Sequence, residues 1–316
     1  MKKVLVIAAA LIVSACGSSS SASTPTPSGP TTVASIAAEV PASMKALAPF
    51  QIATDATYAP NEFINPDTGA ISGWDIDLGN AICKVMGVAC TFNNVIFGDI
   101  IAQLKADQPK YQFSISSWTP TQAREDGGID FITYYKAGEA WIIKVGGTPI
   151  NSAADLCGHG VAVESGTTEE SDAWGYMGQS VGGAPISGDK DNCKAAGKQP
   201  INVLSFSTQT EANSALISGR ADAGWLDQPV ADYQVKQSNG QFKITGQACS
   251  VSPYGFAMVK GSPLEQPITD ALKYLIDHSY YTGTLNQWGV TDGAIASSDV
   301  ALNSNNSIGA SCVPSY

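Results

Sequence analysis

The chain has 316 residues, and its 28 aspartate and glutamate residues outnumber its 17 lysine and arginine residues, which gives a formal net charge of −11 at pH 7. Such an acidic chain is not expected to bind nucleic acid or an anionic membrane through a basic face. Its length allows two lobes of ordinary domain size.

Residues 1–15 have the pattern of a signal peptide. Residues 1–3 are basic at Lys2 and Lys3, residues 4–13 are apolar, and small residues precede Cys16. The apolar run is too short to span a bilayer as a mature helix. The motif Val-Ser-Ala-Cys ending at Cys16 resembles the bacterial lipobox, which implies cleavage before this cysteine and its lipidation. An ordinary secretory signal is the alternative.

The next segment is predicted to be a flexible tether. Serine, threonine, proline and glycine dominate residues 17–32, so this stretch cannot bury a core. We therefore expect residues 16–45 to be a lipidated tether that holds an extracytoplasmic domain at the cell membrane.

Six cysteines remain after Cys16, which is an even number in an oxidising compartment. Fifteen pairings are possible in principle. A metal site is the alternative, but the chain has no CxxC pair, and its two histidines, His159 and His278, lie far apart in sequence. We therefore expect structural disulfides and no metal or cofactor. Spacing along the chain favours the pairs Cys83–Cys90, Cys157–Cys193 and Cys249–Cys312.

The first half of the mature chain alternates strands with helices. Strands are predicted at 50–54, 90–92 and 111–115, and helices are predicted from 78 and around 100–104. This alternation favours an α/β lobe with a largely parallel sheet. Ligands of such sheets bind beyond the carboxyl ends of the strands, where residues 55–60 and 116–124 fall.

A second α/β run starts near residue 156. Its strands are predicted at 160–163, 202–206 and 221–226, and the last of these delivers Asp227 at its end. A strand at 254–259 and helices at 264–277 and 283–288 then return to the first lobe. We expect one lobe from 46–137 and 253–316 and another from 138–252, with hinge crossings near 135–139 and 250–254.

The segment 116–124 carries hydroxyl groups and one guanidinium just after a strand. Arg124 can bind a carboxylate through two parallel charge-assisted hydrogen bonds, and Ser117 and Thr119 can add further polar contacts. The alternative is a polar connection with a surface arginine.

Five sequence blocks follow one another along the chain, at 55–63, 73–78, 116–135, 166–168 and 219–227. In this order they resemble the amino-acid-binding proteins of bacterial ABC importers, extracellular solute-binding protein family 3, which includes histidine-, arginine- and glutamine-binding proteins. The resemblance covers roughly residues 50–288, and the Cys83/Cys90 spacing also matches a disulfide found in some members. It implies a type II periplasmic-binding-protein-like fold, with two α/β lobes joined by a two-segment hinge.

The resemblance also implies roles for individual residues. Arg124 holds the ligand α-carboxylate with help from Ser117 and Thr168, and Asp227 accepts the α-ammonium together with Thr119 and the Ser117 carbonyl. This agrees with elementary chemistry, because a zwitterion taken out of water needs both of its charges matched.

The side-chain pocket is expected to have aromatic walls. Tyr58 and Phe97 match wall positions, Trp118 is expected to line the cleft, and Asp55 is placed to meet a polar or cationic side-chain tip. A half-buried loop aromatic is the alternative for Tyr58, and a core residue is the alternative for Phe97.

Four other positions bear on the extent of the site. Asn61 and Gln112 depart from the family pattern. The family commonly has an aromatic residue at the position of Asn61 and an aspartate at the position of Gln112. Asp75 and Asp77 are interpreted as helix N-terminal carboxylates outside the site.

The expected function is that of a monomeric substrate-binding lipoprotein, which binds a polar amino acid, a basic one included, and delivers it to a membrane permease. The expected mechanism is closure of the two lobes about a hinge, a motion for which periplasmic binding proteins are a general example. An enzyme on the same fold, dehydratase-like or lytic, is one alternative, although no Ser-His-Asp order or GxSxG motif is present. A sensing module for a separate receptor is another.

Overall fold

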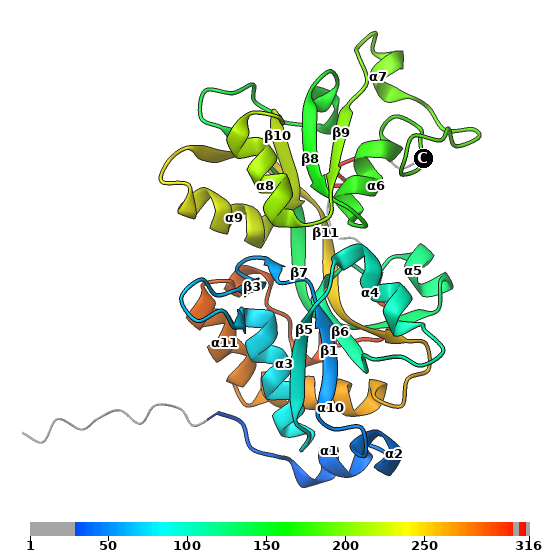
Figure 1. Ribbon diagram of the computed structural model, residues 1–316, viewed down its shortest axis with the longest axis vertical. Coiled ribbons are helices and arrows are strands. Elements are labelled where there is room, and N and C mark those ends of the chain that lie inside the picture. The colour runs from blue at the N-terminus through cyan, green and yellow to red at the C-terminus, as the bar shows by residue number, and fades with distance from the viewer. Residues whose placement is uncertain (1–28, 306–309, 314–316) are drawn as a thin grey trace, which may run out of the picture.

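The computed structural model describes residues 29–305 and 310–313. The signal peptide, Cys16 and the first part of the predicted tether lie outside the described residues. Figure 1 shows two lobes, one above the other, joined by two long strands. No helix in the described part of the chain is long and apolar enough to cross a membrane.

The first lobe contains the beginning of the described chain and its segment from Gly255 to Leu302. A three-stranded sheet of β2 (Thr57–Tyr58), β3 (Glu62–Ile64) and β4 (Ile71–Ser72) lies beside its main strands. Its other elements are α1 (Ala34–Glu39), α2 (Ala42–Lys45), β1 (Phe50–Thr54), α3 (Trp74–Val85), β5 (Cys90–Asn94), α4 (Phe97–Leu104), β6 (Phe113–Trp118), α5 (Gln122–Asp126), α10 (Glu265–Asp277) and α11 (Tyr280–Trp288).

The second lobe is built from the middle of the chain. It consists of a short 3-10 helix (Ala153–Leu156), β8 (Gly160–Glu164), α6 (Thr168–Gly175), α7 (Asn192–Ala195), β9 (Asn202–Phe206), α8 (Gln209–Ser218), β10 (Ala223–Asp227) and α9 (Gln228–Gln237).

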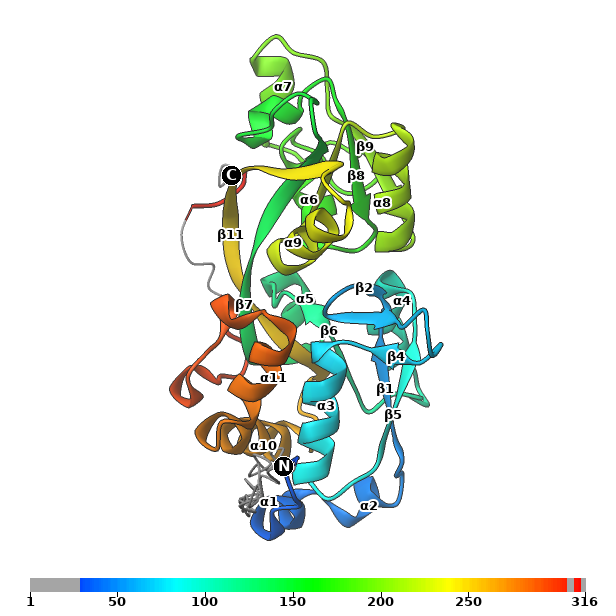
Figure 2. The same cartoon turned by 90° about the vertical axis from the view of Figure 1, so that its left-hand side faces the viewer.

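Two long strands run through both lobes and pair with each other along most of their length (Figures 1 and 2). They are β7 (Ile129–Lys144) and β11 (Phe242–Val259), and they lie centrally in one eight-stranded sheet of order β5-β1-β6-β11-β7-β10-β8-β9. Strands pair in parallel within each half, β1 with β5 and β8 with β9, whereas β7 and β11 are antiparallel. The predicted strand 254–259 is therefore only the end of a longer element.

The register between β7 and β11 is interrupted where the chain passes between the lobes. Breaks lie between Thr245 and Cys249, between Cys249 and Ser252, and between Tyr254 and Gly255. Ladder hydrogen bonds are disrupted at such irregularities, so bending is easiest there. Both hinge segments expected from the sequence fall inside these two strands.

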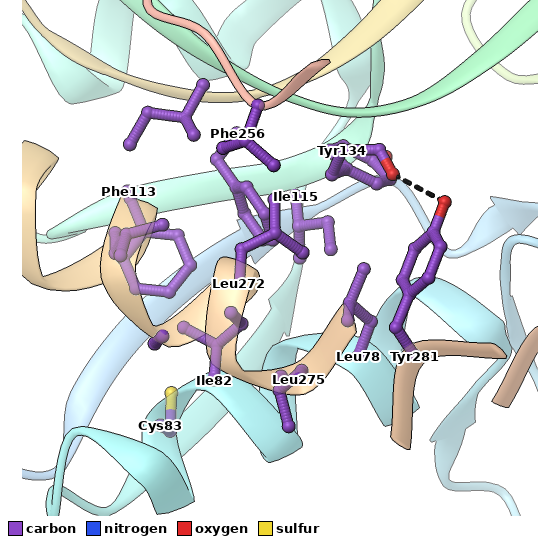
Figure 3. Close-up of a cluster of buried hydrophobic side chains, with 14 of the residues drawn as sticks. Leu78, Ile82, Cys83, Phe113, Ile115, Tyr134, Phe256, Leu272, Leu275 and Tyr281 are labelled. Carbon is purple, nitrogen blue, oxygen red and sulfur yellow. Dashed lines mark hydrogen bonds between the residues drawn. The ribbon is translucent and has the colours of Figure 1, made fainter. Parts of the chain in front are cut away.

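The first lobe has a core in which α3, α10 and α11 cover the sheet (Figure 3). On α3, Leu78 and Ile82 are four residues apart, which places them on one helix face, and both are buried. The Tyr281 hydroxyl donates to the Tyr134 carbonyl at 2.9 Å and so fixes α11 against β7. The packing of these three helices therefore fixes the position of the central strands in the first lobe.

The structure contains three disulfides, in the pairing that the sequence favours: Cys83–Cys90, Cys157–Cys193 and Cys249–Cys312. The last one anchors the C-terminal segment. Leu302 pairs with Ile132 in the first lobe, whereas Cys312 and Val313 pack in the hydrophobic core of the second. The tail therefore contacts both lobes.

We expect the Cys249–Cys312 disulfide to contribute more stability than Cys83–Cys90. Its two cysteines are 63 residues apart in sequence, whereas Cys83 and Cys90 are 7 apart. In the chain-entropy model, the lost entropy of the denatured state corresponds to roughly 4 kcal/mol for the longer loop and roughly 2 kcal/mol for the shorter one. Denaturant unfolding of the two double Cys→Ser variants measures the difference. A larger loss on removing Cys83–Cys90 would contradict the expectation.

Candidate functional site

A cavity lies between the two lobes, at the carboxyl ends of strands from both. It is nearly closed in this arrangement of the lobes, and side chains of both lobes line it. The first lobe contributes Asp55, Tyr58, Glu62, Phe97, Ser116, Ser117, Thr119 and Arg124, and the second contributes Glu164, Thr167, Thr168, Glu169 and Asp227. Every ligand-binding residue expected from the sequence lines this cavity except Trp118.

The Arg124 guanidinium lies at the boundary between the lobes. It donates to the Thr119 carbonyl of its own lobe, and its Nη2 donates to the Gly166 carbonyl of the other lobe at 2.8 Å. Burial lowers the pKa of Arg124 to about 10, so it stays cationic at neutral pH. The remaining guanidinium donors are available to a ligand carboxylate.

Gly166 is a position where only glycine fits well. Its φ of +86° lies in the left-handed region, and a Cβ there would come within 3.1 Å of the Gly98 Cα in the first lobe. The glycine thus allows the two backbones to approach closely beside Arg124.

The prediction that Trp118 lines the cleft is wrong. Its side chain is only 2% exposed, its ring stacks on Phe97 with centroids 4.0 Å apart, and its Nε1 donates to the Ser114 hydroxyl. The Arg124 guanidinium carbon lies 4.9 Å from the Trp118 ring. Because an aromatic face attracts a cation, Trp118 supports Arg124 from behind. Phe97 both packs on it and lines the cavity.

Ser117 is held by a buried hydrogen-bond network. Its φ of +50° is unusual for a residue other than glycine. Its backbone N–H donates to Asp75 Oδ2 at 3.1 Å, its hydroxyl accepts from Asn61 Nδ2 at 2.8 Å, and the Tyr134 hydroxyl donates to Asp75 at 2.8 Å. Asn61, the departure from the family pattern, therefore orients a cavity hydroxyl.

Asp75 has a larger role than that of a helix N-terminal carboxylate. It lies in the first turn of α3 and outside the cavity lining, as expected. However, it is fully buried behind Ser117, and burial raises its pKa to about 7. Asp77, in the same turn, accepts a hydrogen bond from the Trp288 indole on α11. Asp75 therefore orients Ser117 by a hydrogen bond and does not itself line the cavity.

Asp227 faces Arg124 from the second lobe. It accepts a hydrogen bond from the Tyr58 hydroxyl at 3.0 Å, and the same hydroxyl accepts from the Asp227 backbone N–H. Glu169 lies next to it, and Glu169 Oε1 accepts no hydrogen bond from the described residues. Burial raises the pKa of Asp227 to about 6. A cationic group at this end would satisfy both carboxyl groups.

Two further carboxyl groups meet at another part of the cavity. Asp55 accepts from the Thr57 hydroxyl at 2.7 Å and from the Phe97 N–H at 2.8 Å. Glu164 comes from the second lobe and accepts from the Gln209 N–H at 3.1 Å. Burial is the main cause that raises the pKa of both carboxyl groups.

The cavity is therefore acidic, with five carboxyl groups around one guanidinium. In residues 29–305 and 310–313, no three His, Cys, Asp or Glu side chains form a group that could hold a metal ion. The residues that the sequence prediction missed are Glu62, Ser116, Glu164, Thr167 and Glu169. All lie inside or directly beside the sequence blocks noted above, but nothing in their local pattern shows that their side chains turn inward.

The comparisons with known proteins agree with this geometry. The family model of bacterial extracellular solute-binding proteins, family 3, matches residues 50–291. The chain is 30% identical to the arginine-binding protein ArgT of Corynebacterium glutamicum, over 84% of this chain and 82% of the relative. The chain belongs to this family of solute-binding proteins.

Solved structures show the same architecture. An ancestral arginine-binding protein bound to arginine matches with a TM-score of 0.65 and 34% identity, covering 76% of this chain and 97% of that one. The ancestral amino-acid-binding protein AncCDT-1, a precursor of cyclohexadienyl dehydratase, matches with a TM-score of 0.62 and 29% identity, covering 76% and 94%. The two-lobed type II fold is thus confirmed.

Replacing Asp75 by alanine is expected to destabilise the protein by about 3 kcal/mol, because the Ser117 N–H and the Tyr134 hydroxyl each lose a buried acceptor. The matched control is Asp99→Ala, which removes an exposed carboxylate from the first turn of α4. A helix-dipole role alone is worth about 0.3–1 kcal/mol. Denaturant unfolding that gives equal losses for both variants would contradict the buried role of Asp75.

Proposed function

We propose that the cavity binds an L-amino acid with a cationic side chain for import by an ABC transporter. The observation that carries this proposal is the excess of carboxyl groups, five around a single guanidinium. Buried charges are strongly unfavourable unless they are paired. A ligand that brings two cationic groups and one carboxylate reduces this imbalance, whereas a neutral zwitterion leaves it unchanged.

The ligand backbone is proposed to lie between Arg124 and Asp227. The α-carboxylate binds the Arg124 guanidinium, with the Ser117 and Thr168 hydroxyls beside it, and the α-ammonium binds Asp227 with Thr119. This placement is supported by the position of Arg124 and Asp227, which line the same cavity from opposite lobes. A zwitterion therefore contacts both lobes at once, which favours the closed arrangement.

The side chain is proposed to extend between Tyr58 and Phe97 toward Asp55. Both aromatic residues line the cavity, and they provide apolar contact for an aliphatic stem. Asp55 offers a carboxylate at its far end. The names of relatives in this family, arginine-binding proteins among them, support the same ligand class.

We also propose the setting in which the protein works. Lipidated Cys16 and a tether keep a monomeric binding domain at the outer face of the membrane, close to its permease. The expected tether 16–45 is too long, because α1 and α2 fold onto the first lobe, with Ile36 and Val40 in its core. The other expected bounds, 46–137 and 253–316 for one lobe and 138–252 for the other, are likewise adjusted, because Cys312 and Val313 pack in the second lobe. The irregular parts of β7 and β11 act as the hinge. The role is binding without turnover, and incubation with arginine followed by mass spectrometry of the small molecule tests that part.

Replacing Arg124 by alanine is expected to weaken arginine binding at least about a hundredfold, because two charge-assisted hydrogen bonds to the carboxylate are lost. The control is Arg220→Ala, which removes an exposed guanidinium outside the cavity. Isothermal titration calorimetry compares both variants with the wild type. Undiminished affinity in the Arg124 variant would refute the assigned role.

Affinity is also expected to depend on pH through Asp227. Its raised pKa of about 6 means that the carboxyl group holds a proton below that pH, and the proton must leave before the ligand ammonium can bind. Affinity is therefore highest above pH 6 and falls by about tenfold per unit below it. Titrations from pH 4.5 to 8 measure this dependence, and a constant affinity over that range would contradict it.

A further inference from the structure

Two carboxyl groups from opposite lobes meet at the side-chain end of the cavity. Asp55 follows β1 in the first lobe, and Glu164 ends β8 in the second. They are 1% and 2% exposed, both line the cavity, and the Gln209 N–H donates to Glu164 Oε1 and also to the Thr57 hydroxyl, which in turn donates to Asp55. Two buried carboxyl groups that meet in this way need either a proton or a cation between them.

Neither carboxyl group is free to move away. Both oxygens of Asp55 already accept hydrogen bonds from its own lobe, and Glu164 Oε1 accepts from the Gln209 N–H at the start of α8. The Gln209 N–H also approaches the Thr57 hydroxyl, which itself donates to Asp55. This set of contacts joins the lobes and fixes both acids in place.

The other charged groups around the pair do not neutralise it. Glu62 of β3 and Glu169 of α6 are further acids whose pKa burial raises, so they supply no positive charge, and each has one carboxyl oxygen that accepts no hydrogen bond from the described residues. Asp227 is a further acid, and the Tyr58 hydroxyl is neutral. Arg124 is the single cation lining the described cavity, and its guanidinium is directed to Thr119 and Gly166. No cation among the described residues of the cavity is therefore directed to Asp55 and Glu164, and a cationic ligand tip would take the place of the proton that burial favours on this pair.

We propose that Glu164 is a specificity-determining residue, which lets the lobes close tightly only over a ligand that places a cationic side-chain tip between Glu164 and Asp55. This inference rests on the proposed function. It adds that selectivity against neutral amino acids arises from repulsion across the cleft as well as from attraction to Asp55. Discrimination by an unpaired charge against the wrong ligand is a general route to specificity.

The ratio of arginine affinity to glutamine affinity isolates this effect. Both ligands carry the same α-ammonium and α-carboxylate, so contributions of Arg124 and Asp227 cancel in the ratio. In the wild type, we expect the ratio to be at least about a hundred at pH 8, and to decrease on acidification as the carboxyl pair takes up a proton.

The decisive variant is Glu164→Gln, which keeps the shape of the side chain and removes its charge. Arginine binding is expected to weaken by at least about tenfold while glutamine binding strengthens by about tenfold, so the ratio falls by about a hundredfold. Glu211→Gln, an exposed position on α8, is the matched control and leaves the ratio unchanged. Calorimetric titration at pH 8 measures both ligands.

A second variant guards against a local packing effect. Glu164→Lys places a protein cation beside Asp55, so glutamine is expected to bind more tightly than arginine. If both variants bind arginine and glutamine with the wild-type ratio, the role of Glu164 is overturned and the proposed function stands. If the wild type binds neither arginine nor lysine, the proposed function fails, and this inference fails with it.

Discussion

The structure depends on the burial of charge between two lobes. Arg124 lies against Trp118 and Phe97, with its guanidinium reaching the Gly166 carbonyl of the opposite lobe. Five carboxyl groups surround the same cavity. Taking charges out of water costs several kcal/mol per ion unless partners are present. In the proposed mechanism, a ligand that supplies the missing charge stabilises the closed arrangement, which would couple binding to lobe closure.

The fold places these charges where closure can act on them. β7 and β11 run through both lobes and carry register breaks between them, so each lobe can move as a unit. The cavity residues sit at strand ends and helix starts of both halves, including Asp227 at the end of β10 and Thr168 at the start of α6. Core contacts beneath them, such as the Tyr281 hydroxyl on the Tyr134 carbonyl, hold the first lobe rigid. The tail, anchored at Cys249, also contacts both lobes.

Much of this arrangement could be predicted from sequence, because strand ends and turn residues follow local patterns. The helix predicted from residue 78, which begins at Trp74 in the structure, and the strand that delivers Asp227 are examples. The direction of Trp118 could not be predicted, since alternation along β6 does not show which face the opposite lobe covers. Asp75 has the local pattern of a helix-start carboxylate, and only packing against Ser117 and Tyr134 reveals its buried role.

The inward position of Glu164 could not be predicted from the sequence either. Glu164 follows the strand predicted at 160–163, and a carboxylate there is usually solvated. Its inward position depends on Gln209 of α8, 45 residues further along the chain, and on Asp55 in the other lobe. Contacts between distant segments decide such roles, and local periodicity carries no information about them.

A crystal structure of the protein with arginine bound at pH 8 tests the central claim most directly. The account predicts the α-carboxylate on Arg124, the α-ammonium on Asp227, and the guanidinium within hydrogen-bonding distance of both Asp55 and Glu164. A bound arginine whose guanidinium points away from this carboxyl pair, or whose carboxylate does not contact Arg124, would contradict it.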